Sequence, residues 1–111
     1  MLDVQNIGSV SVIKARSALM GECLSQCRQA YEDCIAKRRT LLVINLQDSP
    51  LINSEGLEFI VDAQQGCLSR GGRVAVVEPQ ALCEEVLNIT GVSDYVAVFP
   101  DMRTALSDFA R

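Results

Sequence analysis

The residues best placed for chemistry lie in the segment Ser49–Leu57, where an apolar strand pattern stops and a helical pattern begins. Upstream, the run Leu41–Leu46 indicates a strand that is buried on both faces. Asn53 or Ser54 is a natural N-cap, because a side-chain oxygen there can accept a hydrogen bond from the first helical turn. The unpaired N–H groups and the positive end of the helix dipole favour a negative group. This segment therefore predicts a site that suits a phosphate or an acidic partner.

The chain has no histidine, and this absence limits the reactions that it could catalyse. Histidine is the usual general base and the usual activator of a nucleophilic serine or cysteine. The carboxylate pairs Glu32-Asp33 and Glu84-Glu85 are adjacent in sequence, so on a helix they point in different directions. Gly71-Gly72 lacks the remaining residues of a phosphate-binding or dinucleotide-binding loop. We therefore expect a protein that is not an enzyme and has no cofactor.

The five cysteines are odd in number, and no two of them have the C-x-x-C spacing. A disulfide framework is not expected, and reduced thiols fit a cytoplasmic protein. Cys23, Cys27 and Cys34 recur on one face of a predicted helix, where they could hold a metal or pack as small apolar residues. These positions coincide with the apolar stripe of that helix, so we expect packing and no metal site.

The length and composition predict one domain over residues 1–111, since a chain of this size supports a single modest core. No apolar run approaches the roughly 18 residues of a membrane-spanning helix. The N-terminal residues lack the basic and apolar regions of a signal peptide. The net charge of −4 disfavours nucleic acid, whose phosphates are bound by concentrated Lys and Arg. We expect a cytoplasmic protein that binds neither nucleic acid nor a membrane.

Apolar periodicity and turn residues predict strands and helices that alternate along most of the chain. Strands are expected at 2–6, 9–16, 40–46, 73–78 and 95–99, and helices at 19–37, 54–70, 79–91 and from Asp101 onward. The first two strands form a hairpin through the turn residues of Asn6–Ser9. Continuous apolar strands that alternate with helices are typical of a parallel sheet covered by helices. The predicted fold is α/β, β-β-α-β-α-β-α-β-α, with a mostly parallel sheet of about four to five strands.

The helical pattern also predicts which side chains face the core. In the helix at 54–70, the inward residues are expected to be Leu57, Ile60, Val61, Cys67 and Leu68. In the helix at 79–91, they are expected to include Leu82, Cys83, Val86 and Leu87. Phe59 lies outside the inner stripe, so it is predicted to be exposed beside Ser54, either as an anchor for a docking partner or as an isolated surface residue.

Five segments follow one another in a characteristic order and spacing: Leu41–Leu46, Ile52–Leu57, Gly71–Val74, Leu87–Val92 and Ala105-Leu106. In this succession the chain resembles the STAS domain family, in particular its stand-alone bacterial anti-sigma factor antagonists. The resemblance covers most of the chain and is clearest over residues 40–106. No one of these segments is diagnostic by itself, but their succession is typical of the family. The resemblance implies the α/β STAS-like fold.

The resemblance also implies a function and a site. In the family, the first serine of the motif is phosphorylated by a partner anti-sigma factor with serine kinase activity, and the unphosphorylated form binds that anti-sigma factor. This serine corresponds to Ser54. The implied partner-binding residues are Asn53, Ser54, Glu55, Gly56 and Phe59. The chain departs from the family at Asn53, where Asp is usual, and at Glu55, where Ser or Thr is usual.

Alternatives remain open at the level of the sequence. Ser54 could be a capping hydroxyl only, worth about 1 kcal/mol to the helix. Gly56 could permit a close approach either of the sheet or of a partner. A second function of a different class is a structural adaptor, a STAS module that is not phosphorylated and joins a stress-signalling scaffold or the ATPase of a lipid transporter. The residues also leave open a homodimer through the N-terminal hairpin.

Overall fold

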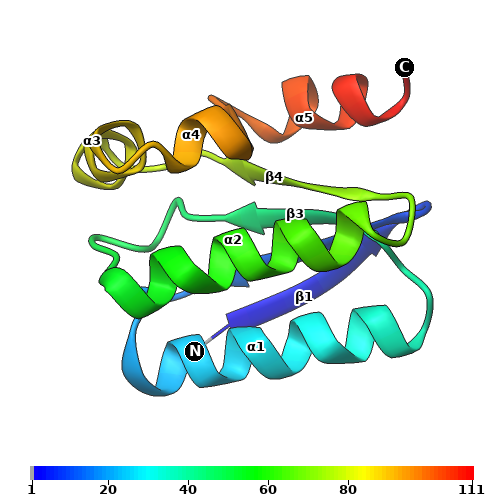
Figure 1. Ribbon diagram of the computed structural model, residues 1–111, viewed down its shortest axis with the longest axis horizontal. Coiled ribbons are helices and arrows are strands. Elements are labelled where there is room, and N and C mark those ends of the chain that lie inside the picture. The colour runs from blue at the N-terminus through cyan, green and yellow to red at the C-terminus, as the bar shows by residue number, and fades with distance from the viewer. Residues whose placement is uncertain (1) are drawn as a thin grey trace.

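The computed structural model describes residues 2–111, which form one five-stranded sheet and five helices (Figure 1). In chain order the elements are β1 (Leu2–Ile7), β2 (Val10–Ala15), α1 (Gly21–Ala36), β3 (Leu41–Asn45), α2 (Ser54–Leu68), β4 (Arg73–Val77), α3 (Ala81–Ile89), α4 (Val92–Tyr95), β5 (Ala97–Phe99) and α5 (Met102–Phe109). The strands lie side by side in chain order, with β1 antiparallel to β2 and the other pairs parallel. The predicted α/β fold with a mostly parallel sheet is confirmed.

The central strands β2, β3 and β4 are mostly apolar because most of their residues are buried on both faces of the sheet. Successive residues of a strand point to opposite faces, and β2 shows the consequence. Ile13 and Ala15 pack in the core shared with α1 and α2, whereas Val10 and Val12 pack in a second, smaller core with α5. Residues of β3 and β4 divide between the two cores in the same alternating way. This arrangement explains the lack of a polar alternation in the sequence of these strands.

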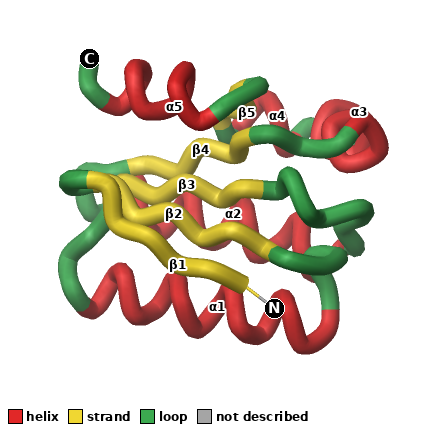
Figure 2. Tube along the Cα trace, turned by 180° about the vertical axis from the view of Figure 1, so that it is seen from behind, coloured by secondary structure: helices red, strands yellow, loops and turns green. Residues whose placement is uncertain are grey.

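The second face of the sheet is covered only in part. Helix α5 packs on β4 and β5 (Figure 2). The antiparallel strand β1 forms the opposite edge, and its residues from Asp3 to Ile7 are exposed. The part of this face near β1 therefore lies beyond the reach of α5 and is accessible from solvent.

Three sequence expectations are wrong in detail. The expected strand at 95–99 begins only at Ala97, because the chain forms the short helix α4 after Gly91, whose φ of 82° suits glycine. Leu82 and Leu68 were expected to face inward but are 54% and 48% exposed. Each is adjacent to a cysteine that was also expected to face inward and does pack in the core, and adjacent residues on a helix point about 100° apart.

The buried side chain of Gln64 connects three elements around the main core. Its amide oxygen accepts a hydrogen bond of 2.7 Å from the N–H group of Val74 in β4. Its amide nitrogen donates to the carbonyl of Tyr95 at the end of α4, at 3.0 Å. Gln64 is 6% exposed, so water cannot readily replace it as a partner for these backbone groups.

We expect Gln64→Leu to lower the free energy of unfolding by about 2 kcal/mol, because it leaves the buried N–H group of Val74 and the partly buried carbonyl of Tyr95 without their partner. Gln65→Leu is the matched control, since Gln65 is the exposed neighbour on the same helix, and we expect a change within about 0.5 kcal/mol. Urea unfolding measures both. Equal stability of the two variants would contradict this role of Gln64.

Candidate functional site

The segment between β3 and α2 is fixed to the rest of the protein at several points. The side chain of Ser49 is buried and donates a hydrogen bond to the carbonyl of Ser17. The N–H group of Leu19 donates to the carbonyl of Leu51 at 2.9 Å, and Leu19 forms an isolated parallel bridge with Ile52. These contacts set the position from which α2 begins.

Gly56 allows the first turn of α2 to pack directly on this connection. Gly56 is buried, and a Cβ atom at this position would lie 2.4 Å from the carbonyl oxygen of Leu19 and 2.8 Å from Cγ1 of Ile52. Both distances are shorter than any van der Waals contact, so only glycine fits without a shift of the backbone. Of the two explanations considered for Gly56, the structure therefore supports the close approach within the chain.

The N-cap of α2 is Asn53, and Ser54 is the first residue of the helix. The Oδ1 atom of Asn53 accepts a hydrogen bond of 2.8 Å from the N–H group of Gly56. The Ser54 side chain is exposed, and within residues 2–111 it makes no hydrogen bond. The alternative that Ser54 is the capping hydroxyl is therefore wrong. The hydroxyl group lies at a helix N-terminus and is available to another molecule.

The expectation that Phe59 is exposed is wrong, because its side chain is only 1% exposed. Its ring packs edge-on against Tyr31 of α1, with 6.2 Å between the ring centroids. The guanidinium of Arg28 lies 5.4 Å from the centre of the Phe59 ring. Because α2 contacts both the sheet and α1, its buried face is wider than the apolar stripe that the sequence predicts for this helix. Phe59 therefore supports the site from the interior of the protein and cannot be an exposed anchor for a docking partner.

Charged groups of α2 surround the exposed end of the helix. Glu55 is exposed beside Ser54, and Glu58 and Asp62 follow on the same helix. Arg28 reaches across from α1, with one nitrogen 3.4 Å from the carbonyl oxygen of Glu55. The other distances from Arg28 are 4.0 Å to Glu58 and 3.9 Å to Asp62, in partly exposed pairs that contribute little to stability. The surface near Ser54 is thus predominantly acidic.

Exposed apolar side chains lie beside this acidic surface. Met20 and Leu51, 41% and 40% exposed, are neighbours because the backbone of Leu19 bonds to that of Leu51. Leu82 is also exposed, at the start of α3, and the thiol of the next residue, Cys83, donates to the carbonyl of Ser49 at 3.3 Å. The sequence analysis did not assign these three residues to the site. The starts of α1, α2 and α3 lie at the same end of the molecule (Figure 1).

The five cysteines are buried and reduced, as expected. Burial raises the pKa of Cys27 to about 12, with a smaller contribution from Cys23. Burial likewise raises the pKa of Cys67 to about 11. These thiols stay protonated at neutral pH and pack as small apolar residues. In residues 2–111 no three His, Cys, Asp or Glu side chains gather as a metal site would require. No helix over the same residues is both long and apolar enough to cross a bilayer.

The fold and the site together define a class of small α/β domains that present an exposed serine at a helix N-terminus, next to the ends of parallel strands. The family model described as the STAS domain matches residues 1–105. The chain therefore belongs to the STAS domain family.

Solved structures of anti-sigma factor antagonists share this fold. A Thermotoga maritima protein assigned to that group is 22% identical, with a TM-score of 0.93 over 99% of this chain and 95% of that one. The anti-sigma factor antagonist SpoIIAA in its unphosphorylated form is 14% identical, with a TM-score of 0.83 over 97% and 95% of the two chains. The Bacillus cell fate determinant SpoIIAA in its phosphorylated form is 16% identical, with a TM-score of 0.77 over 100% of both chains. No curated protein sequence matches this chain significantly.

The cap assignment predicts different effects for two adjacent substitutions. We expect Asn53→Ala to lower the free energy of unfolding by about 1 kcal/mol, because it removes the side-chain acceptor for Gly56. Ser54→Ala should change it by less than about 0.5 kcal/mol, since the hydroxyl makes no contact within the described chain. Chemical denaturation of both variants checks this. A larger loss for Ser54→Ala would show that the hydroxyl caps the helix.

Proposed function

We propose that the protein is an anti-sigma factor antagonist that docks, through the surface around Ser54, onto an anti-sigma factor with serine kinase activity. The observation that carries this proposal is the exposed Ser54 hydroxyl. It does not cap α2, because Asn53 does so, and the start of that helix is held firmly by the rest of the protein. Membership of the STAS family and the fold shared with SpoIIAA support it. The protein acts in the cytoplasm as a binding module without catalysis of its own, and it contacts neither nucleic acid nor a membrane.

The docking surface combines the acidic start of α2 with the apolar side chains beside it. Asn53, Ser54 and Glu55 meet the partner from α2, and Met20 and Leu51 contribute apolar contacts. Gly56 and Phe59 take part indirectly, because they hold the first turn of α2 in place from within the protein. An apolar centre with a charged rim is typical of protein interfaces.

Phosphorylation of Ser54 switches this binding off. A phosphate adds about −1.5 to −2 charges, close to Glu55 and to apolar groups that the partner covers. Repulsion between like charges and the cost of removing water from a dianion both weaken docking. The dipole of α2 favours a negative group at its N-terminus, so the modification leaves the fold intact. The existence of SpoIIAA structures in both phosphorylated and unphosphorylated forms is consistent with such a switch in this family.

Ser54→Asp tests the switch, because it places one negative charge where the phosphate would be. We expect the affinity for the host's anti-sigma serine kinase, measured by isothermal titration calorimetry, to fall about tenfold or more. Ser107→Asp is the matched control, since Ser107 is exposed on α5, in the helical layer on the other face of the sheet. We expect it to bind like the wild type. Equal affinity of Ser54→Asp and the wild type would overturn the switch.

The kinase reaction gives a second, independent measurement. After incubation of the wild type with the kinase and ATP, we expect mass spectrometry to place one phosphate on Ser54. Ser54→Ala should remain unmodified under the same conditions. A phosphate on another residue, or none at all alongside tight binding, would contradict the proposed modification.

Glu55 favours a second candidate function, that of a structural adaptor that is not phosphorylated. Its carboxylate gives this surface a permanent negative charge beside Ser54, which opposes a phosphate there. We expect Glu55→Ser to accelerate phosphorylation of Ser54 in the same kinase assay, while Glu85→Ser, an exposed carboxylate of α3, leaves the rate unchanged. If Glu55→Ser alters neither the rate nor the affinity, this charge has no role in the switch. Stable binding of a scaffold partner without any phosphorylation would favour the adaptor.

A further inference from the structure

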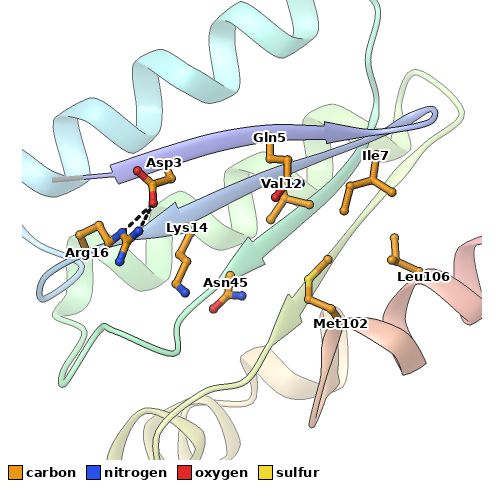
Figure 3. Close-up of a pocket in the computed structure, with 9 residues that line it drawn as sticks. All are labelled: Asp3, Gln5, Ile7, Val12, Lys14, Arg16, Asn45, Met102 and Leu106. Carbon is orange, nitrogen blue, oxygen red and sulfur yellow. Dashed lines mark hydrogen bonds and ion pairs between the residues drawn. The ribbon is translucent and has the colours of Figure 1, made fainter.

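A pocket of about 350 Å³ opens on the face of the sheet opposite to α2. Its walls come from β1, β2, β3 and α5, in the region that α5 leaves uncovered (Figure 3). Its volume lies at the lower end of the roughly 300–1,000 Å³ of pockets that bind small molecules. The pocket is separate from the docking surface around Ser54, which lies on the other side of the sheet.

One end of the pocket is apolar and the other is polar. Figure 3 shows the charged side chains of Asp3, Lys14 and Arg16 at one end, and the side chains of α5 with Ile7 toward the other. The apolar lining consists of Ile7, Val12, Met102 and Leu106. Val12 is buried, and Met102 and Leu106 are half-buried where α5 meets the sheet. A ligand of matching shape has an apolar body and one polar head.

The polar end of the pocket offers a cation that can take one negative head group. Two cations, Lys14 and Arg16, and one carboxylate, Asp3, line the pocket, and the carboxylate of Asp48 lies against both cations. Arg16 is held by Asp3 and by Asp48, the latter at 3.1 Å. Lys14 donates to Gln47 at 3.0 Å and lies 3.7 Å from Asp48. An ammonium group has three donors, so Lys14 can also bind an anion.

Asn45 provides a second polar contact next to Lys14. It is 5% exposed, and in Figure 3 it lies between Lys14 and Met102, where the two ends of the pocket meet. Its oxygen accepts from the N–H group of Gln47 at 2.9 Å, and its nitrogen donates to Glu78 at 3.3 Å. A side-chain amide has two N–H donors, and the second finds no acceptor within residues 2–111. A carboxylate at this point would accept hydrogen bonds from both Asn45 and Lys14.

We propose that this pocket binds a small amphipathic carboxylic acid. Its carboxylate contacts Lys14 and Asn45, and its apolar body packs against Val12, Met102 and Leu106. A head group with a single negative charge is favoured over a dianion such as phosphate, because the carboxylates of Asp3 and Asp48 already lie against the two cations and would repel the second charge. This site goes beyond the proposed function, and it would remain if the docking on an anti-sigma factor were disproved.

Sodium octanoate is a suitable probe, with 1-octanol and acetate as controls that lack the charge or the apolar chain. In an NMR titration of the ¹⁵N-labelled full chain, we expect octanoate at millimolar concentration to shift the amide signals of β1, β2 and α5 in a saturable way. Octanoate should bind about tenfold more tightly than octanol, which is the effect of one hydrogen bond to a charged group. Acetate should produce no saturable shift. Absence of saturable shifts with octanoate, or equal binding of octanol, would overturn the proposal.

Lys14→Met tests the contact between Lys14 and the carboxylate of the ligand. Lys37→Met is the matched control, because Lys37 is the other lysine of the chain and lies beyond the end of α1. We expect Lys14→Met to weaken octanoate binding about tenfold and to leave octanol binding unchanged. Lys37→Met should bind octanoate like the wild type. Undiminished octanoate binding by Lys14→Met would overturn the role of Lys14. The comparison of octanoate with octanol uses the wild-type protein and does not depend on the folding of either variant.

Discussion

The packing of the first turn of α2 on the backbone at Leu19 is the constraint on which the candidate site depends. Gly56 makes this approach possible because any side chain would collide with the carbonyl of Leu19. The same backbone segment holds the connection before α2 through the hydrogen bond from Leu19 to Leu51. Once these contacts form, Asn53 is in place to cap the helix, and Ser54 is left exposed. The site is therefore prepared before any partner binds, which reduces the entropy that docking must overcome.

The two buried faces of the sheet allow one small domain to carry two separate surfaces. Strands β2, β3 and β4 alternate between the two cores, so each strand supports α1 and α2 on one side and α5 on the other. Because α5 is a helix of eight residues, it covers the sheet near β4 and β5 and leaves the end of β2 accessible. Lys14 therefore faces the pocket, while the neighbouring Ile13 and Ala15 face the core beneath α1 and α2.

Much of the fold follows from local patterns, whereas the site depends on contacts between distant segments. The continuous apolar runs at Leu41–Leu46 and in β4 correctly indicated parallel strands. The N-cap of α2 was narrowed to Asn53 or Ser54, and the structure assigns it to Asn53. Phe59 was misassigned because its burial results from packing against Tyr31, which a helical period within α2 cannot reveal. The close approach at Gly56 was one of two explanations, and only the position of Leu19 decides between them. The exposure of Leu82 likewise depends on how α3 lies on the sheet.

Asp48 connects the two surfaces physically. It lies in the segment that leads to Ser54, and one of its carboxylate oxygens is 3.1 Å from Arg16 and 3.7 Å from Lys14 in the pocket wall. Gln47, the preceding residue, bonds to Lys14 through its side chain and to Asn45 through its backbone. An anion that binds Lys14 competes with Asp48 for the same positive charge. Any weakening of that ion pair acts on the segment between β3 and α2, whereas Ser49 and Leu51 keep the start of α2 fixed.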